Sequence, residues 1–207
     1  MKALLKPENG PKRADILSLL FAGGLFEEAI KCLGPAQPAE VQDNASEVIV
    51  TLVNASKDFS LQERPFETKV TIDRIFEIMF DQDGKSTKSY LRGLDVLSTI
   101  IGSLQSPPKS SPDDKGPPPA HPTLLLIGAH LADFKSVITA PNRSRIGTFG
   151  EIVVAGEPAV STIRFLLALI RPRSLEIDQK MIELDLITAS MELFIRCALD
   201  PSHNVYS

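Results

Sequence analysis

The sequence contains no tryptophan, only two tyrosines and only two cysteines, and it has no long run of apolar residues. Aromatic side chains that stack on bases are scarce, and a formal net charge of −4 supplies no basic face, so nucleic-acid binding is not expected. No apolar run reaches the roughly 18 residues that a membrane-spanning helix needs, so no membrane partner is expected. Cys32 and Cys197 are too few for a disulfide framework or a zinc site, and no cofactor is expected.

The N-terminal segment has no apolar stretch long enough for a signal peptide. Together with the low cysteine content, this predicts a cytoplasmic protein, with the nucleus as a second compartment.

Apolar residues at helical spacing dominate the rest of the chain, in which 43% of residues are hydrophobic and 23% charged. Ile72, Ile75, Phe76 and Met79 lie at i, i+3, i+4 and i+7, which is the pattern of an amphipathic helix. Similar patterns predict about eight helices, over residues 13–22, 26–33, 39–57, 66–80, 86–104, 123–139, 158–170 and 174–198.

Several helix ends carry their own signals. Gly23 and Gly24 end the first helix, Ser86 or Thr87 is expected to cap the helix that follows, and Pro122 is a good first-turn residue. Ser174 is expected to cap a long helix to residue 198. Residues 140–157 look irregular, with local extension at 152–155, and no strand pair is expected.

Short connections favour antiparallel neighbouring helices, so we predict an all-α fold of armadillo- or HEAT-like helical repeats, an α-solenoid. An irregular helical bundle is the alternative. The predicted organisation is N-terminal repeats over 12–104, a proline-rich flexible loop over 105–122, and further repeats of the same domain over 123–199. The loop holds seven of the sixteen prolines, which cannot lie inside a helix or a central strand.

Two serines in the proline-rich loop, Ser106 and Ser111, precede prolines and match the minimal pattern of a proline-directed kinase. A phosphate at either serine adds about −1.5 to −2 charge near neutral pH. The alternative interpretation is a spacer without regulation.

Catalytic residues are sparse. His130 and Asp133 lie three residues apart on one predicted helix, where a carboxylate can orient a histidine as general base. No serine or cysteine nucleophile with a recognisable motif accompanies them. We therefore expect no enzyme, and an all-α enzyme with a site near this pair is the remote alternative.

Three stretches, taken in order, resemble the SAPS-domain family, the regulatory subunits of protein phosphatase 6-type enzymes. They are residues 14–20 (ADILSLL) through 43–50 (DNASEVIV), residues 130–138 (HLADFKSVI) after the proline-rich loop, and residues 156–170 followed by 182–194 (IELDLITASMELF). Two features depart from the family pattern: residues 157–159 read Glu-Pro-Ala instead of Asn-Thr-Arg, and no tryptophan-rich segment follows Phe194.

This resemblance implies a non-catalytic scaffold that binds a Ser/Thr protein phosphatase catalytic subunit and further adaptor proteins. The catalytic metal ions would then belong to the partner. A generic armadillo-like adaptor with a different client is the alternative. Asp133 and Phe134 match the family's Leu-x-Asp-Phe helix and are candidate contacts. The arginines that flank helix ends form a candidate basic rim, namely Arg143, Arg145, Arg171 and Arg173.

Overall fold

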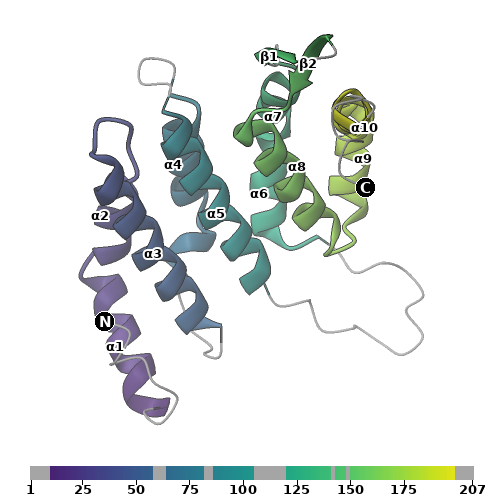
Figure 1. Cartoon of the computed structure of the whole chain (residues 1–207). Helices are drawn as coiled ribbons and strands as arrows, with labels where there is room; N and C mark the ends of the chain where they lie inside the picture. The colour runs from purple at the N-terminus through teal and green to yellow at the C-terminus, as the bar shows by residue number, and fades with distance from the viewer. Residues whose placement is uncertain are drawn as a thin grey trace, which may run out of the picture. The chain divides into compact units, whose positions relative to one another are not determined.

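The computed structural model describes residues 10–57, 64–81, 86–104, 120–140, 143–147 and 150–198. These residues form ten α-helices, one short 3-10 helix and two strands (Figure 1). The chain divides into two compact units. The first comprises Met1–Pro108 with His121–Leu126, and the second comprises Lys109–Ala120 with Ile127–Ser207.

The first unit is built from stacked helices. Its elements are α1 (Gly10–Ala22), α2 (Leu25–Lys31), α3 (Ala39–Ser56), the 3-10 helix η2 (Pro65–Glu67), α4 (Lys69–Met79) and α5 (Thr87–Ser103). Helix α2 packs on α3 and α4 packs on α5, while α2 also contacts α4 and α3 contacts α5 most extensively. Two helix pairs therefore lie one upon the other, which is consistent with helical repeats.

The core of the first unit is centred on phenylalanines. Phe21, Phe26 and Phe66 have ring centroids between 5.9 and 6.2 Å apart, and Phe26 and Phe66 are fully buried. Phe66 comes from η2, where Pro65 fixes the backbone and suits the first turn. The short 3-10 helix thus places one large side chain beneath α1 and α2.

Local signals set the ends of these helices. The Ser86 hydroxyl accepts a hydrogen bond from the Ser89 amide at 3.2 Å, which confirms it as the cap of α5. Thr68 caps α4 in the same way. Gly24 has φ +72°, a left-handed conformation that favours glycine and ends the first helix where the sequence predicts.

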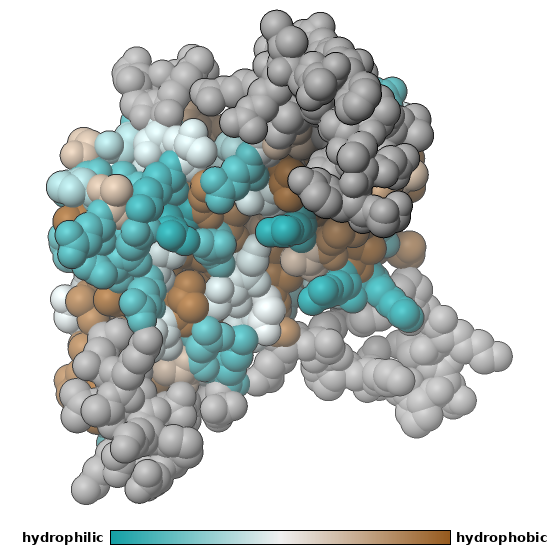
Figure 2. Space-filling view, viewed as in Figure 1, coloured by the Kyte–Doolittle hydropathy of each residue, from teal (hydrophilic) through white to brown (hydrophobic). Residues whose placement is uncertain are grey.

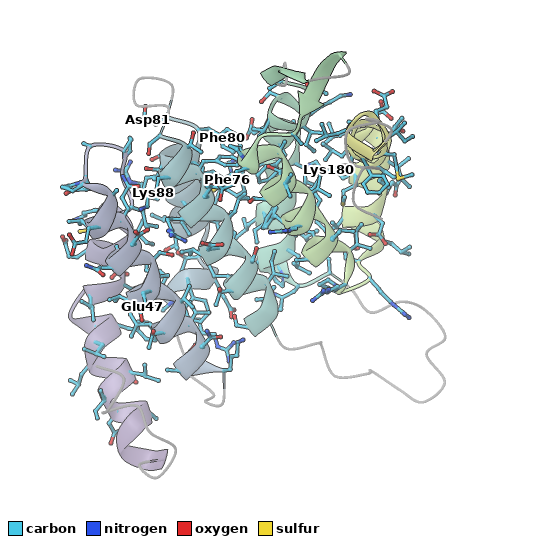
Figure 3. The ribbon with its side chains drawn as sticks, viewed as in Figure 1. Glu47, Phe76, Phe80, Asp81, Lys88 and Lys180 are labelled. Atoms are coloured by element: carbon cyan, nitrogen blue, oxygen red, sulfur yellow. The ribbon has the colours of Figure 1, made fainter. Side chains whose placement is uncertain are left out.

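Polar side chains of α3 connect it to its surroundings. The Gln42 amide donates to the carbonyl oxygens of Gly34 at 3.1 Å and Gln37 at 2.9 Å, which holds the connection that follows α2. Asp43 accepts hydrogen bonds from two side chains of α5, Lys88 at 2.7 Å and Arg92 at 2.8 Å. The side chain of Lys88 reaches from α5 to Asp43 of α3 (Figure 3).

The second unit contains most of the remaining elements. Helix α6 (Pro122–Ala129) begins at Pro122, as predicted. It is followed by α7 (Leu131–Thr139), strands β1 (Arg143–Gly147) and β2 (Gly150–Val154), α8 (Glu157–Ile170), α9 (Leu175–Glu183) and α10 (Leu186–Ala198). Helix α7 packs on both α8 and α10, and α9 packs on α8 and α10.

Two long helices predicted from the sequence are each divided in two. The helix expected over 123–139 is interrupted at His130, whose φ of −97° and ψ of 6° leave the helical region. The helix expected over 174–198 is interrupted at Leu184 and Asp185, and Asp185 has φ 58°. Apolar periodicity continues across both breaks, so the sequence pattern did not reveal them.

A strand pair also differs from the prediction for residues 140–157. Strands β1 and β2 form an antiparallel hairpin, with Arg143 opposite Val154 and Gly147 opposite Gly150. Three consecutive β-branched residues from Ile152 favour the extended conformation, and the glycines on either side of the turn favour chain reversal. The fold is therefore helical with one added hairpin.

Candidate interaction surface

The predicted His130–Asp133 pair is present but loosely arranged. His130 Nδ1 lies 3.6 Å from Asp133 Oδ2, at the start of α7, with His130 partly exposed and Asp133 exposed. The nearby Ser136 hydroxyl donates to the backbone oxygen of Asp133 at 2.8 Å. The pair therefore lies at the start of α7, on a side of the helix that is open to solvent.

Phe134 lies in the core of the second unit. Its side chain has 0% exposure, and its ring centroid is 5.2 Å from that of Phe165 in α8. Phe134 therefore packs α7 against α8.

The four predicted rim arginines lie in two places. Arg171 and Arg173 are exposed between α8 and α9, where Arg173 has φ 57°. Arg143 and Arg145 lie on β1, and their side chains are outside the described residues. Ser106 and Ser111 also lie outside the described residues.

The described residues contain no group of three or more histidine, cysteine or acidic side chains placed to hold a metal ion. None of their helices is both long enough and apolar enough to cross a membrane.

Sequence reasoning missed a surface on α8. This helix buries one apolar face against its neighbours, through residues that include Phe165, Leu166 and Leu169. A second apolar stripe runs along another face at helical spacing and comprises Val160, Ile163, Leu167 and Ile170. Leu167 is 57% exposed, so this second stripe is open to solvent. Figure 2 shows hydrophobic residues gathered over α8.

Helix α10 has a matching second stripe. Leu186, Ala189 and Leu193 are buried, whereas another side of the helix exposes Ile187, Met191, Phe194 and Ile195. Met191 is 56% and Phe194 66% exposed. A helix that is apolar on two sides normally has both sides covered.

Apart from Ile195, the residues of the two stripes line a common groove with a volume of about 410 Å³. Helices α8 and α10 form its walls and Met181 of α9 contributes to its lining. Among the lining side chains only Arg164 and Ser190 are polar. Exposed apolar surface of this kind marks interaction sites on soluble proteins.

Basic groups lie along α8. Arg164 is exposed and lines the groove, and Arg171 and Arg173 follow the C-terminal end of the helix. None of the three guanidinium groups forms an ion pair with another described residue. The groove therefore combines apolar walls with one lining arginine, Arg164, that has no ion-pair partner among the described residues.

One signal for this groove was present in the sequence. Residues 158–170 hold more apolar positions than a single helix face can accommodate. The excess indicates a second contact face, but only the structure shows which residues remain exposed.

The family model for SAPS, described as SIT4 phosphatase-associated protein, matches residues 2–190. The match spans most of the 207 residues, so the chain belongs to the SAPS family, as the three resembling stretches predict. Family membership supports a phosphatase-associated regulatory role. No curated protein and no solved structure matches the chain.

Proposed function

We propose that this chain is a non-catalytic regulatory scaffold that binds the catalytic subunit of a phosphatase 6-type Ser/Thr phosphatase. The family match over residues 2–190 is the observation that carries the proposal. The stacked helix pairs add support, because such arrays offer extended surfaces to partner proteins.

In this proposal the chain positions the phosphatase and contributes no reacting group. Asp133, Arg171 and Arg173 are the exposed members of the candidate contact set, and their charges would orient the partner during encounter. Phe134 would act from within, by fixing α7 against α8. The metal ions that catalyse phosphate-ester hydrolysis would be the partner's.

Binding of the purified chain to a purified phosphatase 6-type catalytic subunit tests the proposal. Circular dichroism first establishes that the sample is helical. We expect saturable capture by the folded chain, and no hydrolysis of a phosphopeptide by the chain alone. A folded chain that captures no catalytic subunit contradicts the proposal.

Charge reversal tests the candidate contacts. The double variant Arg171→Glu with Arg173→Glu is expected to weaken capture by about tenfold at low salt, because exposed charges steer association. Arg74→Glu is the matched control: Arg74 is exposed on α4 and pairs only locally with Glu77 at 2.8 Å. Equal capture by both variants would remove the arginines from the interface.

A generic adaptor with a different client is the second candidate. The groove between α8 and α10 favours it, because this apolar surface needs no phosphatase to explain it. This candidate would be supported if the folded chain binds another protein and does not bind the phosphatase.

A further inference from the structure

We propose that the groove between α8 and α10 binds an amphipathic α-helix of another protein, with acidic residues beside its apolar stripe. This inference goes beyond the proposed function, since it concerns the groove itself and does not require phosphatase binding.

The shape of the groove fits a helix. Its walls are two helices, and each presents apolar residues three or four positions apart, as in the pairs Val160–Ile163 and Ile187–Met191. Residues 160 to 170 of α8 span about 15 Å at 1.5 Å per residue, or about three turns. Helices that dock in apolar grooves use anchors at the same i, i+3, i+4 and i+7 spacing.

The burial pattern shows that the exposed stripes are additional surface. Helices α8 and α10 already bury one face each in the second unit, through Phe165 and Leu186 among others. Leu167 and Phe194 extend from other faces and are mostly exposed. Covering these side chains would remove apolar area from water without displacing any core contact.

The charged residues around the groove indicate which kind of helix would bind there. Arg164 lines the groove, and Arg171 and Arg173 lie beyond the end of the same wall, all without an ion pair to a described residue. On the opposite wall, α10 carries Glu192, which interacts with other groups of the chain. Acidic side chains on the flank of a bound helix would therefore complement the α8 wall.

Three synthetic peptides, each about 18 residues or five turns long, test the proposal. One carries a leucine stripe with glutamate on both flanks, the second replaces each glutamate with lysine, and the third scrambles the leucines. Binding to the full chain is followed by fluorescence anisotropy. We expect the acidic peptide to bind at least about tenfold more tightly than either other peptide, and less tightly as salt is added.

Variants of the chain then test where the peptide binds. Leu167→Lys is expected to weaken binding of the acidic peptide at least about tenfold, because it puts a charge in the apolar wall. Val70→Lys is the matched control, since Val70 is 80% exposed on α4 of the first unit. Arg164→Glu should reverse the preference, so that the lysine peptide binds more tightly.

Several results would overturn the proposal. These are equal binding of the acidic and lysine peptides, no binding of any peptide, or loss of binding in Val70→Lys to the same extent as in Leu167→Lys. Sedimentation that shows a dimer abolished by Leu167→Lys would assign the groove to a second copy. Leu167-dependent flotation with phosphatidylserine-containing vesicles would assign it to a lipid surface.

Discussion

At the scale of single residues, Asp43 joins two helices that are distant in sequence. The hydrogen bond from Lys88 has the largest effect and lowers the pKa of the Asp43 carboxyl below its ordinary value. Desolvation opposes it with the next-largest effect, and the hydrogen bond from Arg92 lowers the pKa further. Arg92 interacts with two carboxylates. Its hydrogen bond with Asp95 has the largest effect and raises the pKa of Arg92, and its hydrogen bond with Asp43 raises it further. The cluster therefore connects α3 and α5 through charged groups.

The depressed pKa of Asp43 predicts a pH-dependent contribution to stability. A group whose folded pKa lies below its unfolded value stabilises the fold above the unfolded pKa, about 4 for aspartate, and that contribution is lost as pH falls through the folded value. We expect Asp43→Asn to be less stable than the unmodified chain at pH 7, with the difference shrinking toward zero below about pH 4. Urea unfolding at several pH values measures it.

Asp15→Asn provides the control for this titration, because Asp15 is an exposed aspartate of α1. Its difference from the unmodified chain should stay small throughout the pH range. A difference for Asp43→Asn that is unchanged between pH 7 and pH 3 would contradict the assignment.

Residue-level signals were predictable only where they are local. Ser86, Pro122 and Ser174 act within the turn that they begin, so the sequence reveals their roles, and the Ile177 amide donates to the Ser174 hydroxyl at 3.4 Å. The ion pair between Asp43 and Lys88 joins residues 45 positions apart. No local pattern indicates such a pair, because it depends on how α3 and α5 pack.

At the scale of elements, the close approach of α4 and α5 depends on Gly93. A Cβ atom at this position would lie 2.2 Å from Met79 Cγ and 2.5 Å from its Sδ. We expect Gly93→Ala to destabilise the chain by about 1–3 kcal/mol, because Met79 or the helix must move. Urea unfolding gives the change in the free energy of unfolding.

Gly102 of the same helix is the matched control, since a Cβ there meets nothing within 4 Å. Gly102→Ala should stabilise the chain by up to about 1 kcal/mol, through helix propensity alone. Adding Met79→Ala to Gly93→Ala should yield less than the sum of the two separate losses. Equal effects of the two glycine substitutions would rule out overpacking.

The break between α9 and α10 depends on the backbone of Asp185. Its φ of 58° lies in the left-handed region, which aspartate, asparagine and glycine enter more readily than other residues. We expect Asp185→Asn and Asp185→Gly to be tolerated, and Asp185→Val to lose about 1–2 kcal/mol more. Thermal or urea unfolding distinguishes them. A valine variant as stable as the asparagine variant would show that the break does not require this conformation.

The sequence predicted which segments are helical better than it predicted where a helix is interrupted. The apolar spacing over residues 66–104 predicted α4 and α5 closely, because one face of each helix carries the signal. The same signal runs through His130 and Asp185, so the breaks were hidden. The hairpin at β1 and β2 was missed because five-residue strands carry little periodicity.

At the scale of the whole molecule, exposed apolar surface is unevenly distributed along the described residues. Nine of their twelve exposed large hydrophobic side chains lie between Val160 and Ile195. The native chain should therefore bind an apolar fluorescent dye such as ANS. Leu167→Glu with Phe194→Glu should remove more than about half of the signal while changing stability by less than about 0.5 kcal/mol.

Val70→Glu serves as the control for dye binding, because Val70 is isolated on α4 and highly exposed. It should leave the fluorescence unchanged. Dye fluorescence that responds equally to substitutions on α4 and on α8 would show that the dye does not report the groove.

The candidate site was only partly predictable at this scale. Family resemblance predicted Asp133 and Phe134 as candidate contacts, and the structure shows that Asp133 is exposed and Phe134 is in the core. The groove depends on which of two apolar faces of α8 remains uncovered. The apolar positions of α8 show that two faces exist, and only the packing of α7 and α9 against α8 decides which one is covered.

Because Gly24 has a positive φ, the chirality of any residue that replaces it affects the stability of the first unit. L-residues are strained at φ +72°, whereas a D-residue has that region as its preferred one. Cys32 lies eight positions further on, so native chemical ligation at Cys32 can introduce D-alanine at position 24 without changing any other residue. The D-alanine protein should be about 0.4–1 kcal/mol more stable than the glycine protein in urea unfolding, and the L-alanine protein less stable than both. The same methyl group would thus stabilise or destabilise the fold according to its chirality.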